Sequence, residues 1–241
     1  METLWLEETG STNNYLKDNW GSVKPMTLVV AVNQTAGRGQ RGNSWESEPG
    51  KNLTFSFYFS PEGVRPAEQF VVSEAVSLAM VRTLEEYGIS AEVKWPNDIY
   101  VGDRKICGIL IENSIFGDSI SRCFVGIGLN VNQEKFVSDA PNPVSMTMLT
   151  GKRYCLEEVL ACFGRKMERY MACLADRLAL HREYKTMLWR RAGAHPFRDN
   201  SNGEIFSAFI EDIKLSGHLV LRDNYTNGLR TYAFKEVAFI T

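Results

Sequence analysis

The sequence predicts an α+β protein in which a mixed, largely antiparallel sheet packs with helices and is followed by a small C-terminal β barrel. Strand-like segments alternate with segments of helical spacing up to about residue 191, and the central strands are joined by tight turns of the kind that connect antiparallel neighbours. After residue 194 the strand-like runs follow one another without a helical pattern. We therefore expect one domain at residues 1–193 and a second at residues 194–241.

The first third of the chain alternates strand and helix signals. Three segments have the apolar runs or the period of two that strands show, namely residues 4–6, 28–32 and 53–59. Ser11 and Thr12 offer hydroxyl caps to a helix that ends near residue 20. A longer helix is predicted at residues 66–87, where apolar side chains recur at helical spacing before Gly88.

The remaining elements follow from turn signals and from a return of helical spacing. Strand patterns cover residues 91–94, 99–101, 105–112 and 123–131, and later residues 205–213, 218–221 and 229–234. Turns at Trp95–Asp98, Gly102–Asp103 and Phe116–Asp118 make the central strands successive and antiparallel. Residues 156–191 have helical spacing with a break near residue 175, which predicts two helices.

Composition and charge exclude several classes of protein. The 27 basic and 29 acidic residues give a formal charge of -2, too balanced for a surface that coats DNA. The sequence has neither the apolar run of about 20 residues that a membrane helix needs nor an N-terminal signal, so we expect a cytoplasmic protein without a membrane partner. The five cysteines lie in apolar segments and are expected to be buried free thiols. The three histidines lack the spacing of metal ligands, so no metal-binding residue is named.

A glycine-rich segment follows the strand predicted at residues 28–32. Residues 37–42 fit the pattern G-x-G-x-x-G, but residues 43–50 do not predict the helix that dinucleotide binding requires, so that interpretation fails. Arg38 and Arg41 lie among glycines that let backbone amides approach an anion. This segment alone is equally compatible with a phosphate or acyl-phosphate site and with a solvated loop.

A second group of polar residues surrounds a predicted hairpin. Lys94-Trp95-Pro96-Asn97-Asp98 is, by itself, better explained as a proline turn between strands. Together with the glycine-rich segment, it indicates a rigid support that holds Asn97, Asp98 and Lys105 for a nucleotide. Gly126 and Gly128 weaken the strand that carries them unless something must approach its backbone closely.

Five motifs in this order make the sequence resemble the biotin-protein ligase (biotin-[acetyl-CoA-carboxylase] ligase) family over nearly its whole length. They are Ser11-Thr12-Asn13, residues 34–42 with Trp45, residues 94–98, residues 105–112 and residues 126–131. The resemblance implies a catalytic domain like that of class II aminoacyl-tRNA synthetases, and an SH3-like C-terminal barrel. It also implies that biotin and MgATP give biotinyl-5'-AMP, and that a lysine of a carrier domain then receives the biotinyl group. The partner would be a biotin carboxyl carrier protein or a biotinyl domain of a carboxylase or decarboxylase, and a homodimer is compatible with the resemblance.

The resemblance carries site residues over by position. The biotin site would contain Ser11, Thr12, Asn13, Gln34, Gly37, Arg38, Gly39, Gln40, Lys105 and Gly108. The ATP site would contain Arg38, Arg41, Trp45, Asn97, Asp98, Lys105 and Asn130. Arg38 and Lys105 would supply positive charge where the biotin carboxylate meets the α-phosphate. Asp98, the third catalytic candidate, would either orient the nucleotide or accept the proton of the carrier lysine.

The sequence departs from the family pattern in two places. Gln40 stands where the family often has arginine, so either Arg41 substitutes for it or the adenylate is held less tightly. The first motif begins at residue 11, so we expect no preceding DNA-binding domain and no DNA partner. Two alternatives stay open: a lipoate or octanoate ligase of the same fold, and a noncatalytic biotin-adenylate sensor.

Overall fold

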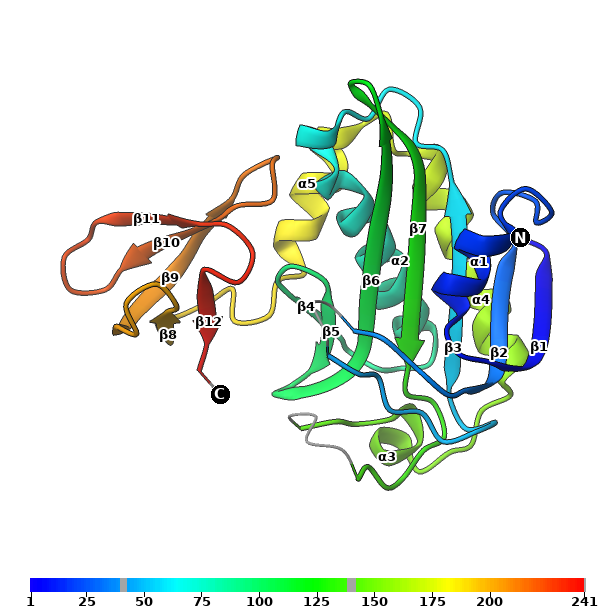
Figure 1. Ribbon diagram of the computed structural model, residues 1–241. Helices are drawn as coiled ribbons and strands as arrows, with labels where there is room; N and C mark the ends of the chain where they lie inside the picture. The colour runs from blue at the N-terminus through cyan, green and yellow to red at the C-terminus, as the bar shows by residue number, and fades with distance from the viewer. Residues whose placement is uncertain (40–42, 138–141, 241) are drawn as a thin grey trace.

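The protein is an α+β molecule with two sheets (Figure 1). Its structure is a computed structural model that describes residues 1–39, 43–137 and 142–240. A seven-stranded sheet carries most of the helices, and the C-terminal residues form a five-stranded antiparallel sheet. The predicted fold class is confirmed.

The large sheet is mixed but largely antiparallel. Its strands, in sheet order, are β1 (Thr3–Thr9), β2 (Leu28–Gln34), β3 (Leu53–Phe59), β7 (Ser119–Leu129), β6 (Arg104–Phe116), β5 (Asp98–Val101) and β4 (Glu92–Lys94). Only β1 and β2 pair in parallel among the described strands. Their crossover contains α1 (Thr12–Asn19), whereas hairpins join β4 to β5, β5 to β6 and β6 to β7.

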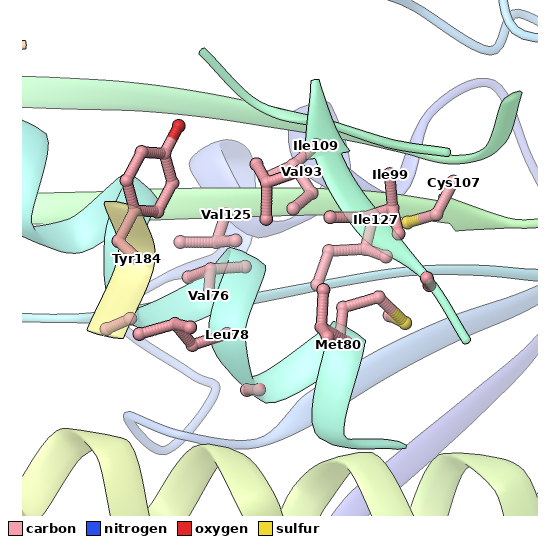
Figure 2. Close-up of a cluster of buried hydrophobic side chains, with 14 of the residues drawn as sticks. Val76, Leu78, Met80, Val93, Ile99, Cys107, Ile109, Val125, Ile127 and Tyr184 are labelled. Atoms are coloured by element: carbon pink, nitrogen blue, oxygen red, sulfur yellow. The ribbon is translucent and has the colours of Figure 1, made fainter. Parts of the chain in front are cut away.

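Helices cover the two faces of this sheet unequally. The larger core lies on the face covered by α2 (Phe70–Glu86), α4 (Leu156–Ala172) and α5 (Arg177–Thr186). Val76 and Met80 of α2 approach Val125 and Ile127 of β7 in this core (Figure 2). The opposite face is covered by α1, whose Leu16 packs into a small second cluster. One short helix cannot cover the whole of this face, which leaves room for a site.

The structure corrects three sequence expectations. The helix predicted at residues 66–87 is divided into the 3-10 helix η2 (Pro66–Glu68) and α2. The helix α3 (Met146–Thr150) was missed, because about one turn is too short to show helical periodicity. The predicted break between α4 and α5 is present. All five cysteines are free, but Cys155 and Cys173 are exposed rather than buried, because they cap the two ends of α4 where it reaches the surface.

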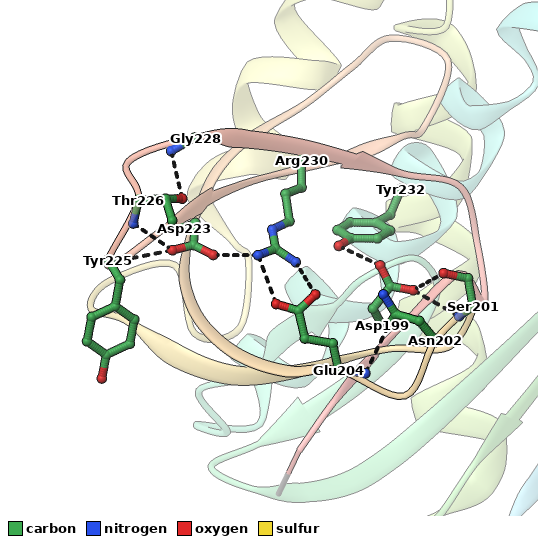
Figure 3. A network of polar contacts seen from close by, with 10 residues as sticks. All are labelled: Asp199, Ser201, Asn202, Glu204, Asp223, Tyr225, Thr226, Gly228, Arg230 and Tyr232. Atoms are coloured by element: carbon green, nitrogen blue, oxygen red, sulfur yellow. Dashed lines mark hydrogen bonds and ion pairs between the residues drawn. The ribbon is translucent and has the colours of Figure 1, made fainter.

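The C-terminal sheet begins at residue 195. Its strands, in sheet order, are β11 (Leu229–Tyr232), β10 (Leu219–Asp223), β9 (Ile205–Ile213), β8 (His195–Asp199) and β12 (Val237–Phe239). The prediction missed β8 and β12, which are short. A polar network crosses this sheet, in which Arg230 contacts the carboxylates of Glu204 and Asp223 (Figure 3). The Trp95 indole N–H donates to the carbonyl of Gly217 at 2.9 Å and so links the two sheets.

Candidate functional site

A cavity of about 1050 Å³ is bounded by the start of α1, the glycine-rich segment, the β4–β7 strands and the C-terminal sheet. It collects most of the residues that the sequence singled out. The predicted residues that line it are Ser11, Thr12, Asn13, Gln34, Arg38, Gly39, Trp45, Asn97, Asp98, Lys105, Gly108 and Asn130. Gly37 lies beside the cavity and does not line it. Gln40 and Arg41 lie outside the described residues.

The register of the large sheet explains why distant motifs meet here. Thr54 of β3 pairs with Gly128, Gly128 with Gly108, Gly108 with Asp98, and Asp98 with Lys94 of β4. Directly paired residues of antiparallel strands present their side chains on the same face. These five residues therefore form one row across the sheet, which we call the floor row.

The two glycines of the floor row make room for an aromatic ring. A Cβ atom added to Gly128 would lie 2.2 Å from the Trp45 ring, and one added to Gly108 would lie 2.9 Å from it. The Trp45 indole thus lies directly against the backbones of β6 and β7. The same space at Gly108 admits the end of Lys105, 3.4 Å from such a Cβ. This close approach is the reason why glycines interrupt these strands.

The two predicted catalytic cations are both exposed to this cavity, but each contacts a carboxylate. The Lys105 Nζ lies 2.8 Å from Asp98 Oδ1 and 5.7 Å from the centre of the Trp45 ring. The Arg38 Nη2 donates to Glu112 Oε2 at 3.1 Å and to Asn14 Oδ1 at 2.6 Å. Arg38 and Lys105 therefore line one cavity, and an incoming anion would compete with these two carboxylates for them.

Glu112 connects the glycine-rich segment with α1. Besides Arg38, it accepts a hydrogen bond from Asn13 at 2.9 Å and pairs with Lys17 at 2.7 Å. Burial by itself raises the pKa of Glu112, but the hydrogen bonds from Lys17 and Asn13 outweigh this effect and hold the pKa below its ordinary value. Glu112 therefore remains ionised at neutral pH and orients two of the predicted site residues.

A buried polar group lies at the α1 end of the cavity. The backbone N–H and the hydroxyl of Thr12 donate to Gln34 Oε1 at 3.0 and 3.2 Å, and the hydroxyl also lies 2.7 Å from that of Ser56. Ser11 and Asn13 are buried beside it. Asn13 Oδ1 has no hydrogen-bond partner among the described residues. Because a buried acceptor without a partner is costly, this end of the cavity is suited to a polar ligand that offers N–H donors.

Two asparagines elsewhere on the cavity wall, Asn97 and Asn130, differ in whether a polar atom remains available to a ligand. The Asn97 amide donates to the carbonyl of Ile109, so it holds the turn before β5 against β6. The Asn130 amide donates to the Val144 carbonyl at 3.1 Å, and its buried Oδ1 has no partner within the described part of the chain. Asn130 thus has an acceptor available for a ligand, whereas the N–H of Asn97 serves the protein.

Sequence reasoning missed several residues of the cavity. Ser56, Tyr100, Lys235 and Phe239 line it but belong to no motif quoted above. Lys94 also lines it, and its position was inside a motif without being assigned a role. The pairing of Lys94 with Asp98 across the predicted turn was the signal that could have placed it on the same face.

Two features, a cluster of metal ligands and a membrane-spanning helix, are absent from the described residues. They contain no group of three or more His, Cys, Asp or Glu side chains arranged for a metal ion. No helix formed by residues 1–39, 43–137 and 142–240 is both long and apolar enough to cross a membrane.

The chain is similar to known proteins over much of its length. Residues 5–130 match the model of the Biotin/lipoate A/B protein ligase family. The Biotin--[acetyl-CoA-carboxylase] ligase of Paracoccus denitrificans is 31% identical over 182 residues, which are 70% of this chain and 72% of that protein. The Bifunctional ligase/repressor BirA of Bacillus subtilis is 33% identical over 177 residues, which are 69% of this chain and 53% of that protein. The chain thus spans about half the length of the Bacillus relative.

The fold has a counterpart among solved structures. A biotin protein ligase from Aquifex aeolicus in complex with biotin and ATP superposes with a TM-score of 0.82 and 24% identity. The match covers 98% of this chain and 97% of that one. It includes both sheets of the present molecule.

Proposed function

Because the chain belongs to the Biotin/lipoate A/B protein ligase family, we propose that it is a biotin-protein ligase. It activates biotin with ATP to form biotinyl-5'-AMP and then transfers the biotinyl group to a lysine of a carrier protein. The observation that carries this proposal is the meeting of Arg38 and Lys105 at one cavity that also holds a buried polar end and an aromatic ring.

The first step joins two anions. A carboxylate oxygen of biotin forms a bond to the α-phosphorus while the bond from that phosphorus to the bridging oxygen breaks, and pyrophosphate leaves with the electron pair. Arg38 and Lys105 offset the repulsion between the reacting groups and stabilise the charge that develops. Both cations must exchange their contacts with Glu112 and Asp98 for contacts with the substrates.

The α1 end of the cavity suits the ureido ring of biotin. This ring offers two N–H donors and one carbonyl acceptor, which Ser11, Thr12, Asn13 and Gln34 match with hydroxyl and amide groups. The free Oδ1 of Asn13 is one acceptor for a ring N–H. Gly39 and Gly108 line the cavity and keep the neighbouring backbone close to the acyl chain, and we assign Gly37 and Gln40 to the same site.

The nucleotide occupies the part of the cavity beside Trp45. The indole offers a flat surface for adenine, and Asn130 Oδ1 offers an acceptor for its amino group. Asn97 contributes by fixing the turn that carries Asp98. Mg²⁺ usually binds ATP phosphates with one or two protein carboxylates, and Asp98 is the carboxylate of the floor row that fits this role. We assign Arg41 to the ATP site as well.

The second step requires a carrier lysine that has lost its proton. Asp98 accepts that proton or orients the lysine, and the amine nitrogen then attacks the biotinyl carbonyl while AMP leaves. The partner is a biotin carboxyl carrier protein or a biotinyl domain of a carboxylase or decarboxylase. In this proposal residues 1–193 form the catalytic domain of a cytoplasmic enzyme, residues 194–241 form a second domain, and the enzyme is a monomer or a homodimer.

One experiment tests the proposed function. The purified protein is incubated with ATP labelled at the α-phosphate and with biotin, lipoate or octanoate, first without and then with an acceptor domain. We expect labelled biotinyl-5'-AMP in the first case and biotinylated lysine plus AMP in the second. If the protein adenylates lipoate or octanoate in preference to biotin, that acid and not biotin is its substrate. A protein that binds biotinyl-5'-AMP but neither forms it nor transfers its biotinyl group would be a noncatalytic sensor.

A further inference from the structure

Lys94 is a cation in this cavity without an assigned role. Its Nζ donates to the Tyr100 hydroxyl at 2.9 Å and lies 4.5 Å from the centre of the Tyr100 ring, 5.2 Å from that of Trp189 and 5.8 Å from that of Phe239. No carboxylate among the described residues lies within ion-pair distance of it, since Asp98 pairs with Lys105 instead. Burial lowers the pKa of Lys94. This ammonium is therefore partly removed from water without a direct ion pair, and Asp98 attracts it only from a longer distance.

A second lysine lines the same cavity from the C-terminal sheet. Lys235 lies in the turn before β12, with φ of +71°, and it lines the cavity together with Lys94. The Asn200 side chain donates to the Lys235 carbonyl at 2.8 Å and fixes this turn. The described residues offer no carboxylate at ion-pair distance from Lys235 either. Two lysines from different sheets thus line one cavity, and neither forms an ion pair with a described carboxylate.

The floor row gives the distance of Lys94 from the reacting groups. Lys94 lies two strands beyond Gly108, on which Lys105 and Trp45 rest. At about 4.8 Å per strand this separation is roughly 10 Å, before the length of the lysine side chain is considered. A nucleotide whose α-phosphate lies at Lys105 can therefore extend its β- and γ-phosphates toward Lys94, away from the biotin end.

A purely structural role explains the position of Lys94 less well than the binding of an anion does. Ring contacts and one neutral hydrogen bond compensate part of the cost of removing an ammonium from water, but an apolar residue would fill an aromatic corner without that cost. A compact group with several negative charges, by contrast, gains from both lysines at once.

We propose that Lys94 and Lys235 form the subsite for the β- and γ-phosphates of ATP and for the pyrophosphate that leaves. The proposal rests on the proposed function. When the bond between the α-phosphorus and the bridging oxygen breaks, its electron pair stays on the pyrophosphate, and the two lysines stabilise that added charge. Arg38 and Lys105 act on the α-phosphate side, so the two pairs of cations serve different parts of the same nucleotide.

The test separates ligands with and without the two outer phosphates. Lys94→Met keeps the aliphatic stem and removes the charge, Lys235→Met does the same on the opposite wall, and Lys214→Met is the control, because Lys214 is exposed and does not line the cavity. For each variant, the KM for ATP and the inhibition of adenylation by inorganic pyrophosphate are measured. The Kd values for AMP and biotin and the transfer rate from prepared biotinyl-5'-AMP are measured in parallel.

We expect Lys94→Met to raise the KM for ATP and the inhibition constant of pyrophosphate at least tenfold, and Lys235→Met to raise both about threefold. AMP affinity, biotin affinity and transfer should stay within twofold of the wild-type values, and Lys94→Arg should restore most of the ATP affinity. Equal losses for AMP and pyrophosphate would show general damage and overturn the proposal, as would unchanged ATP and pyrophosphate values. If Lys94→Met does not fold, Lys235→Met and Lys94→Arg decide by the same criteria. A wild-type protein that forms no adenylate would refute the proposed function instead.

Discussion

The two glycines of the 126–131 motif should affect different substrates when each is replaced by alanine. A Cβ atom at Gly128 would lie 2.2 Å from the Trp45 ring, whereas one at Gly126 would lie 3.0 Å from Asn13 Oδ1. Ordinary contacts between carbon atoms begin near 3.5 Å, so Gly128→Ala must displace the indole by about 1.3 Å. At Gly126 the Asn13 side chain must move by a few tenths of an ångström.

The magnitude follows from what each side chain is proposed to bind. A displacement of about 1 Å in a positioned group can cost up to 10²-fold in rate, so we expect Gly128→Ala to lower kcat/KM for ATP by 10- to 100-fold. Biotin affinity should change less than threefold, because the hydrogen bonds between Thr12 and Gln34 do not involve the indole. Gly126→Ala should show the converse pattern, with a loss of about three- to tenfold in biotin affinity through Asn13.

The assay combines biotin titration by calorimetry with adenylation rates at varied ATP. Gly21→Ala is the matched control, because a Cβ atom there would meet nothing within 4 Å and its φ is not positive. Thermal unfolding establishes that each variant is folded. If Gly128→Ala leaves ATP kinetics unchanged, or weakens biotin as much as ATP, then Trp45 does not form the nucleotide surface and the reasoning is wrong.

Two further predictions concern the C-terminal sheet. Trp95→Phe removes the hydrogen bond to Gly217 and should lower the free energy of unfolding by about 1 to 2 kcal/mol, measured in urea; no loss would mean that this link does not stabilise the molecule. The hydrogen bond from Arg230 lowers the pKa of Glu204, so the stability it provides is complete above roughly pH 5 and is lost as the pH falls and the folded carboxylate is protonated. Melting temperatures between pH 6 and pH 3 should therefore fall less for Glu204→Gln than for the wild type, and parallel curves would contradict this assignment.

The sequence predicted the elements that carry the site better than the contacts within it. Period-two strands and tight turns placed Asp98, Lys105, Gly108 and Gly128 on neighbouring strands, and pairing in the sheet then brought Asp98, Gly108 and Gly128 into one row. The glycines themselves indicated a close approach to the backbone. The sequence could not show that the approaching group is the Trp45 ring. Along the chain, Trp45 lies about 60 residues from Gly108 and about 80 residues from Gly128.

Other features depended on tertiary structure without a local signal. Glu112 ends a quoted motif, yet its contacts with Asn13, Lys17 and Arg38 arise only when α1 and the glycine-rich segment pack beside β6. Phe239 lines the cavity from β12, a strand too short to show a pattern. Residues of this kind are recruited by the packing of the two sheets, which no spacing along the chain records.

The central claim is that Arg38 and Lys105 act together where biotin meets the α-phosphate. The most direct measurement is single-turnover formation of biotinyl-5'-AMP at saturating biotin and ATP by the wild type, Arg38→Met, Lys105→Met and the double variant. We predict that each single change lowers the rate at least 100-fold, equivalent to about 2.7 kcal/mol, and that the double change costs less than the sum because the cations act on one transition state. A rate within threefold of the wild type for either single variant would contradict the account.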